Sequence, residues 1–295
     1  MGVGKRLGAL TLILIFAVLF ALPGCSVSTT RPAMANLALC ALVPSSPSEA
    51  EDIASFLKDA LDDFKVIDAL ITDSELGLLE DETSTDEEMT MEELEYYLGL
   101  LGTYSSSIKN TLGEIKARPT PNHQDIGKFR TAEISQFELA DDLISEYMQL
   151  LNYYQSLLSM SKEIEKLENV DSTDLETIYK SFSEGIGKAI DKLKGSNVPT
   201  FLKSMNDNTI ASLTEFGSAV LYMLQAEYLD DPVRRDAATY RMGILQRKFE
   251  RITEDSNQDM DDRTGKLKDD LKNIQRLNDG LKQWALGNID KLSDQ

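Results

Sequence analysis

The chain has 295 residues, a formal net charge of −20 and a sequence pI near 4.5. This acidity argues against a nucleic-acid-binding protein, because such proteins use clustered Lys and Arg to displace counterions from phosphates. One His and two Cys are too few for a site with paired His ligands, a Cys₄ zinc site or a disulfide-rich scaffold, so we expect no metal and no cofactor.

The choice of apolar residues indicates a helical protein. The chain contains 41 Leu but only 9 Val. Leu is a strong helix former, whereas β-branched residues favour strands. No segment has a strand pattern, and no Gly-rich phosphate-binding loop is present in the sequence.

The N-terminus has the pattern of a secretory signal. Lys5 and Arg6 form a basic start, and residues 7–22 then run without a charge. A basic start followed by a short apolar core is typical of signal peptides. The core is slightly shorter than the ~20 apolar residues of a membrane-spanning helix.

The segment that follows this core, Leu22-Pro23-Gly24-Cys25, resembles the lipobox of bacterial lipoproteins. Leu22 and Gly24 match that motif, whereas Pro23 departs from it. The resemblance covers only the leader. It implies a signal peptide over 1–24, lipidation of Cys25 as the mature N-terminus, and an extracytoplasmic protein anchored to the membrane of the bacterial cell envelope. Two or three acyl chains would hold the protein firmly, since a single chain binds only marginally.

Three other interpretations of the leader remain open. The apolar segment can stay as an uncleaved membrane anchor. An ordinary signal peptidase can cut after residues 33–35, which read Ala-Met-Ala. The lipidated residue can also be Cys40, although Leu39 before it is large for a lipobox. We favour lipidation at Cys25, followed by a tether over 25–45 and a helical bundle domain over 46–295.

The first half of this domain contains three predicted helices. Ser46 and Glu49 form a capping box for a helix that extends to about residue 71. A second helix starts at Thr85 or Thr90, each followed three residues later by Glu, and ends before Pro119. The third helix covers about 131–169 and carries two adjoining apolar seams, which indicates contact with more than one neighbour.

The second half of the domain continues the helical pattern. A fourth helix runs from Thr173, with Glu176 completing a capping box, to a C-cap at Gly195, and a fifth starts near Val198-Pro199. A sixth follows a cap at Asp231, and the polar stretch 254–263 separates it from a last helix with Asn278 at a core position. The apolar stripe of the sixth helix comprises Val233, Ala237, Tyr240, Ile244, Leu245, Phe249 and Ile252.

Together these elements predict an all-α fold, an elongated bundle of six or seven helices or a set of stacked helical hairpins.

Three segments resemble chemical sites but are better explained by structure. Residues 66–108 contain twelve acids and no base, which is typical of a solvated acidic loop and a helix N-terminus. Residues 255–266 begin like a calcium-binding EF-hand loop but lack its Gly and its final Glu, so we expect a polar turn. His123 lies in a Pro-containing loop without a second His. We therefore expect no catalytic or metal-binding residues.

The C-terminal part of the chain is the predicted docking region. Residues 232–295 are close to neutral, whereas the preceding part of the chain is strongly acidic. Basic side chains gather on the sixth helix and form the predicted docking surface: Arg234, Arg235, Arg241, Arg247 and Arg251.

From these features we expect a lipid-anchored binding or scaffolding module at the bacterial cell envelope that is not an enzyme. Its expected partners are the membrane, through lipidated Cys25, and an envelope protein, with no nucleic acid. Two alternatives remain. One is a membrane-active protein similar in broad architecture to α-helical pore-forming toxins. The other is an envelope hydrolase that uses a pair of carboxylates.

Overall fold

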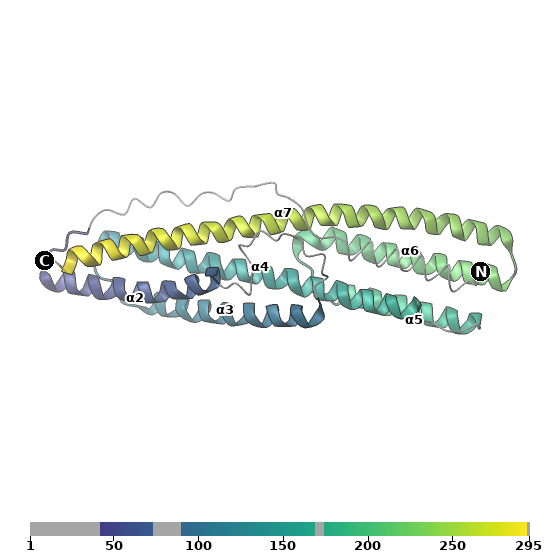
Figure 1. Cartoon of the computed structure of the whole chain (residues 1–295), viewed down its shortest axis with the longest axis horizontal. Coiled ribbons are helices and arrows are strands. Elements are labelled where there is room, and N and C mark those ends of the chain that lie inside the picture. The colour runs from purple at the N-terminus through teal and green to yellow at the C-terminus, as the bar shows by residue number, and fades with distance from the viewer. Residues whose placement is uncertain (1–41, 73–89, 169–173, 294–295) are drawn as a thin grey trace. The chain divides into compact units, whose positions relative to one another are not determined.

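The fold is all-α, as predicted. The computed structural model describes residues 42–72, 90–168 and 174–293, and within these ranges it contains six α-helices, one short 3₁₀-helix and no strand (Figure 1). In chain order the elements are α2 (Pro47–Thr72), α3 (Met91–Ala117), α4 (Gln124–Glu168), α5 (Leu175–Lys194), η1 (Thr200–Leu202), α6 (Lys203–Tyr228) and α7 (Pro232–Ser293).

Several predicted helix caps are confirmed. At the start of α3, Thr90 Oγ1 accepts from the Glu93 N–H at 3.2 Å while Glu93 accepts from the Thr90 N–H at 2.7 Å, a reciprocal capping box. Asp231 caps α7 by accepting from the backbone N–H of Val233 and Arg234, and Gly195 ends α5. The cap of α5 is Asp174 rather than the predicted Thr173, which lies outside the described residues.

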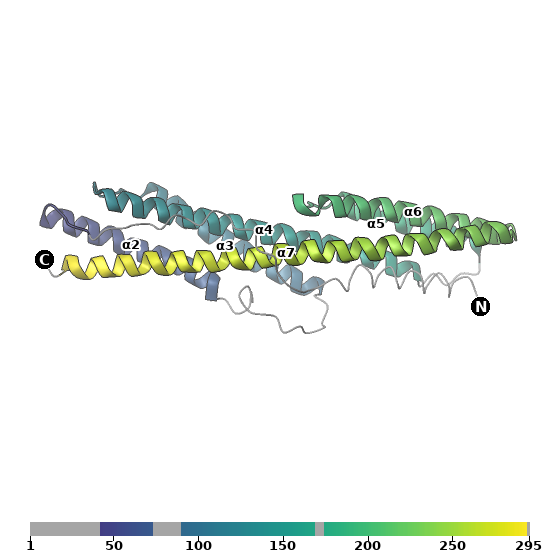
Figure 2. The same cartoon turned by 90° about the horizontal axis from the view of Figure 1, so that it is seen from above.

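The predicted break between the sixth and last helices is wrong. Residues 254–263 are helical, and α7 is one helix of 62 residues, drawn as an unbroken ribbon in both views (Figures 1 and 2). The stretch is polar but contains neither Pro nor Gly. Asp, Asn and Ser lower helix propensity by only about 0.5 kcal/mol each relative to Ala, so polarity alone does not end a helix.

The start of α4 also differs from the prediction. The helix begins at Gln124 and not at residue 131. His123 supplies the cap: its carbonyl accepts from the Gly127 N–H at 3.0 Å, and its Nδ1 accepts from the Asp125 N–H at 3.2 Å. His is an unusual capping residue, which is why the sequence pattern missed this helix start. The only His of the chain therefore has a structural partner at a helix end.

The chain divides into two compact units. The first consists mainly of residues 149–168 and 174–263, and the second of residues 42–72, 95–148 and 264–293. The first unit is built mainly from segments of α4, α5, α6 and α7, and the second from segments of α2, α3, α4 and α7.

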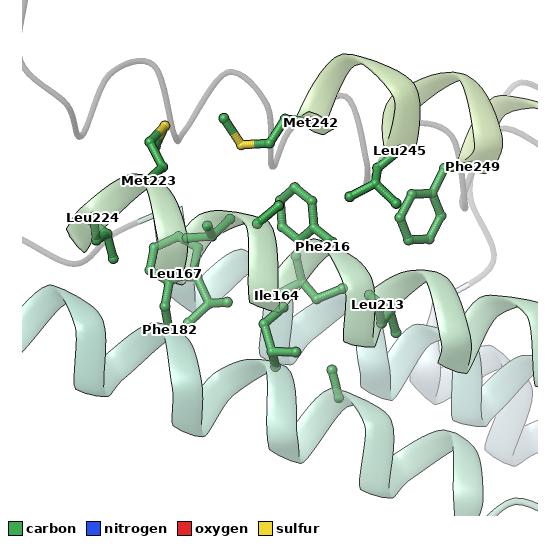
Figure 3. Packing of buried hydrophobic residues seen from close by; sticks show 14 of the residues in the cluster. Ile164, Leu167, Phe182, Leu213, Phe216, Met223, Leu224, Met242, Leu245 and Phe249 are labelled. Atoms are coloured by element: carbon green, nitrogen blue, oxygen red, sulfur yellow. The ribbon is translucent and has the colours of Figure 1, made fainter. Parts of the chain in front are cut away.

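The core of the first unit is a cluster of apolar side chains from α4, α5, α6 and α7 (Figure 3). Phe182, Phe216 and Phe249 are its aromatic members, and all three are nearly inaccessible to solvent. Side chains at steps of three and four residues share one face of a helix, so each helix presents one apolar stripe to this cluster.

The core stripe of α7 differs in part from the predicted one. Leu245 and Phe249 are buried as predicted, but their buried neighbours on the helix are Ala238 and Met242. Four predicted core residues are instead exposed: Val233, Ala237, Tyr240 and Ile244. Helix α7 thus carries two apolar stripes in this region, and the sequence pattern merged them into one.

Two neighbouring glycines of α5 give a matched test of the packing in the first unit. A Cβ placed on Gly185 would clash with the side chain of Leu167, whereas a Cβ on Gly187 would meet nothing within 4 Å. We expect Gly185→Ala to lower the free energy of unfolding by about 1–3 kcal/mol through overpacking. Gly187→Ala is expected to leave it unchanged or raise it by up to ~1 kcal/mol through helix propensity.

Urea denaturation followed by circular dichroism measures both glycine variants. Equal stabilities of the two would contradict the close contact between α5 and Leu167.

Candidate functional site

The predicted site residues fall into two groups. Leu22, Gly24 and Cys25 lie outside the described residues, so the lipobox and the lipidation site remain sequence predictions. The five predicted docking arginines all lie on α7, in the first unit.

The structure does not bring all five arginines together on one surface. Arg235 is half-buried and pairs with Glu227 at 3.1 Å and Asp230 at 3.2 Å, so it ties the start of α7 to the end of α6. Arg234 pairs with the capping Asp231 at 3.3 Å. These two arginines therefore form ion pairs at the turn between α6 and α7.

Three arginines remain available for a docking surface. Arg241, Arg247 and Arg251 are exposed, and Arg251 lies 3.9 Å from the exposed Asp255. Arg247 and Arg251 share one side of the helix because they are four residues apart. They continue the exposed row that begins with the four residues wrongly predicted to be core. We call this row the outer stripe: Val233, Ala237, Tyr240, Ile244, Arg247 and Arg251.

The second unit contains a buried cluster of charged residues that the sequence did not predict. Asp63 of α2, Arg118 at the end of α3 and Glu133 of α4 meet in its interior. An Nη2 hydrogen bond joins Arg118 to Asp63, and Nη1 of Arg118 lies 3.7 Å from Glu133 Oε1, beyond hydrogen-bond distance. Glu133 has no exposed surface, and Asp63 is 9% exposed.

A second arginine of the cluster closes the end of α3. Arg130 of α4 donates from Nη2 to the carbonyl oxygens of Ile115 and Lys116, at 3.1 and 2.8 Å, and from Nη1 to the hydroxyl of Thr120. The last carbonyls of a helix lack intrahelical donors and carry partial negative charge, so a guanidinium is a favourable partner for them.

The environment of the cluster shifts Glu133 toward its neutral form. Burial raises the pKa of Glu133 to about 8, because removal from water disfavours the carboxylate. The positive charge of Arg118 opposes this shift of the pKa, and the negative charge of Asp63 adds to it. Neither oxygen of Glu133 accepts a hydrogen bond from a described residue, which also favours the neutral form.

Asp63 has a different balance of forces. Burial raises its pKa as well, whereas the hydrogen bond and charge of Arg118 act to lower it. On balance the pKa of Asp63 is raised, although the hydrogen bond from Arg118 favours its ionised form, whereas no such bond reaches Glu133. Carboxylate hydrolases also separate the protonation states of two acids. Here, however, both acids are buried among the helices of the second unit and are not accessible to a substrate in this conformation. They connect α2 and α4 to the end of α3 through Arg118.

A group of aromatic side chains adjoins the charged cluster through Phe56. The guanidinium of Arg118 lies 5.5 Å from the ring centroid of Phe56, and Phe129 stacks on Trp284 at 5.1 Å. Phe129 also makes edge contacts with Phe56 and Phe64. These rings add apolar surroundings on one side of the cluster, and a lower local dielectric strengthens the interactions among its charges.

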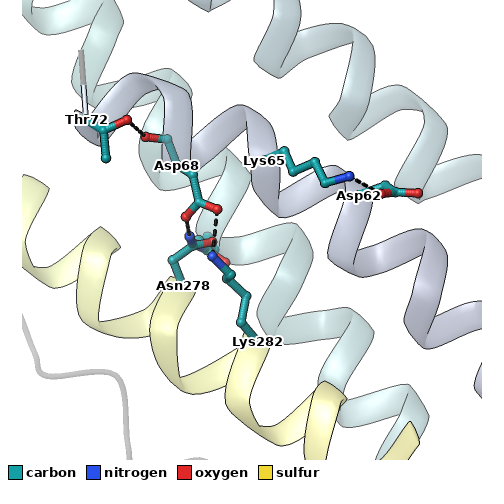
Figure 4. Close-up of polar contacts among 7 residues, drawn as sticks. Asp62, Lys65, Asp68, Thr72, Asn278 and Lys282 are labelled. Atoms are coloured by element: carbon teal, nitrogen blue, oxygen red, sulfur yellow. Dashed lines mark hydrogen bonds and ion pairs between the residues drawn. The ribbon is translucent and has the colours of Figure 1, made fainter.

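A second buried polar group connects three helices of the same unit. Gln136 of α4 donates to Asn278 Oδ1 at 2.9 Å, and Asn278 donates in turn to Asp68 Oδ1 of α2 at 2.6 Å. Lys282 donates to the other oxygen of Asp68, also at 2.6 Å (Figure 4). The predicted core position of Asn278 is confirmed, since it is almost fully buried. Such a network fixes the register of the helices more than it adds stability.

The sequence and the structure were compared with known proteins and families. No family model, no curated protein and no solved structure matches the chain.

Proposed function

We propose that the protein is a lipid-anchored extracytoplasmic module that docks an envelope protein through α7. The observation that carries this proposal is the outer stripe, where exposed Tyr240 and Ile244 continue into Arg247 and Arg251. Aromatic and Arg side chains are the residues most enriched at the centres of protein interfaces.

The leader supports the anchoring part of the proposal. Leu22, Gly24 and Cys25 match the lipobox pattern, and they follow the basic start and apolar core of a signal peptide. Acyl chains on Cys25 would hold the protein at the membrane, because two or more chains bind it stably.

The anchoring is tested by replacing each cysteine in turn. We expect Cys25→Ser to abolish incorporation of labelled palmitate in bacteria and to prevent release of a mature chain that begins at residue 25. Cys40→Ser is the matched control and is expected to keep both the label and the mature N-terminus. The measurements are fluorography of metabolically labelled cells and mass spectrometry of the mature protein. Labelling that persists in Cys25→Ser, or that is lost in Cys40→Ser, would contradict the assignment.

A further inference from the structure

The first part of α7 has two parallel rows of side chains with the same spacing. The inner row is buried and comprises Ala238, Met242, Leu245 and Phe249. The outer stripe advances by alternating steps of four and three residues from Val233 to Arg251. Alternating steps of four and three are the spacing of a and d positions in a coiled coil, which face a neighbouring helix.

The outer stripe has no neighbour among the described residues that covers it. Val233 is 77% exposed, Tyr240 72% and Ile244 43%. Single exposed apolar residues are common on protein surfaces. A row of apolar residues at coiled-coil spacing is less common, and it matches the surface on which a helix of another protein packs.

The charge of the outer stripe defines the partner further. Arg247 and Arg251 occupy its last two positions, and Arg241 lies beside it. A charge covered by a partner helix is costly unless an opposite charge meets it. The pair between Arg251 and Asp255 does not meet this need, because both side chains are exposed and 3.9 Å apart. The partner must therefore supply Asp or Glu at the facing positions.

The stripe is a poor match to a second copy of itself. Two parallel copies would place the arginines of one chain against those of the other. Two antiparallel copies would place each Arg pair against Val233 and Ala237, so the outer stripe itself would offer the arginines no acid. A bilayer is also a poor match, because Asp230 is 97% exposed at the start of this region and the whole chain is strongly acidic.

We propose that the outer stripe binds an amphipathic helix of a partner protein, with apolar residues facing Val233 to Ile244 and acidic residues facing Arg247 and Arg251. This inference rests on the proposed docking function and names the chemical class of its partner. Apolar contact supplies affinity, and the two arginines select for the acidic helix and set its register.

Two synthetic helical peptides test the proposal with the full chain. Both carry Leu at the central heptad positions. The first peptide has Glu at the two outermost heptad positions of each end, so that acids face Arg247 and Arg251 in either direction of binding. The second peptide has Lys at the same positions. Fluorescence anisotropy of labelled peptides measures the affinity. We expect the Glu peptide to bind at least about tenfold more tightly than the Lys peptide.

Variants of the chain complete the test. The double variant R247E/R251E is expected to reverse the preference between the peptides. K272E/R276E is the matched control, since both side chains are exposed on α7 outside the stripe and the charge change is equal, and it is expected to keep the preference. Tyr240→Glu is expected to weaken binding of both peptides by about tenfold or more, with an unchanged circular dichroism spectrum.

Three results would overturn the proposal. The first is that the two peptides bind with equal affinity, or that neither peptide binds. The second is a dimer in sedimentation velocity that R247E/R251E abolishes, which would assign the stripe to a second copy. The third is binding to phosphatidylglycerol vesicles that depends on the same arginines. Labelling at Cys25 is measured separately, so a failure of the peptides removes the partner class and leaves the anchoring part of the proposed function intact.

Discussion

Replacing Arg118 with Met is expected to lower the free energy of unfolding by about 3 kcal/mol or more at pH 8. Arg118 is the cation that contacts both buried acids of the second unit, through its hydrogen bond to Asp63 and its approach to Glu133. Met has a similar length and fills the same space beside Phe56. The loss would therefore report the two acids left without their cation rather than a cavity.

The effect of Arg118→Met should depend on pH. Without the guanidinium the pKa values of both acids rise further, because its charge acts to lower them in the wild type. Raised pKa values mean that the folded state is favoured while the acids are protonated and loses that advantage as pH increases. We therefore expect a smaller loss at pH 5 than at pH 8 in urea denaturation. Arg241→Met, at an exposed position, is the control and should change stability by less than about 0.5 kcal/mol.

An equal loss for Arg118→Met at both pH values would contradict the role of charge in this cluster. It would indicate that Arg118 acts through its contact with the Phe56 ring, which does not depend on the protonation of the acids.

Periodicity predicted the helices well because local spacing carries that information. Apolar residues also recur at steps of three and four along α2, and Ile53, Phe64 and Ile67 of this series are fully buried. The pattern was less reliable where one helix carries two stripes on different faces. On α7, Ile244 and Leu245 are adjacent in sequence, but Ile244 is half-exposed and Leu245 is buried. Only packing against a neighbouring helix decides which stripe becomes the core, and a single sequence does not contain that neighbour.

The charged cluster was beyond prediction for a related reason. Asp63 lies in α2 and Glu133 in α4, whereas Arg118 directly follows α3, and nothing in their local sequence distinguishes them from surface charges. One signal was present, since Glu133 lies in phase with the buried Phe129 and Ala140. Placing the start of the third helix at residue 131 removed Phe129 from that pattern. The unusual His123 cap therefore also concealed the buried position of Glu133.

The charged cluster and the outer stripe have different physical roles. The cluster lies within the second unit, where burial couples helix packing to protonation. The outer stripe belongs to the first unit and is accessible on the surface of α7. Variants of the cluster should therefore change stability, whereas variants of the stripe should change binding at constant stability. This difference allows the docking hypothesis to be tested without unfolding the protein.

Replacing Glu133 with Gln is expected to remove a pH dependence of stability that the wild type shows. The pKa of Glu133 is raised from 4.5 in the unfolded chain to about 8 in the folded one, mainly by burial. The folded state then binds the additional proton, so its advantage is complete below pH 4.5 and is lost as pH rises through 8. One such proton contributes a slope of about 1.4 kcal/mol per pH unit at most.

Gln has the shape of the protonated acid and does not titrate, so Glu133→Gln should match the wild type near pH 5 and exceed its stability at pH 9. Urea denaturation at intervals from pH 5 to pH 9 measures the difference, which cancels the titration of groups that the two proteins share. Glu138→Gln is the control on the same helix. It removes an exposed pair with Lys116, and its effect should stay small at every pH because solvent screens such pairs.

A difference between Glu133→Gln and the wild type that does not grow from pH 5 to pH 9 would show that Glu133 is ionised in the folded protein. The cluster would then be a fully charged ion network, and the greater loss expected for Arg118→Met at high pH would disappear with it.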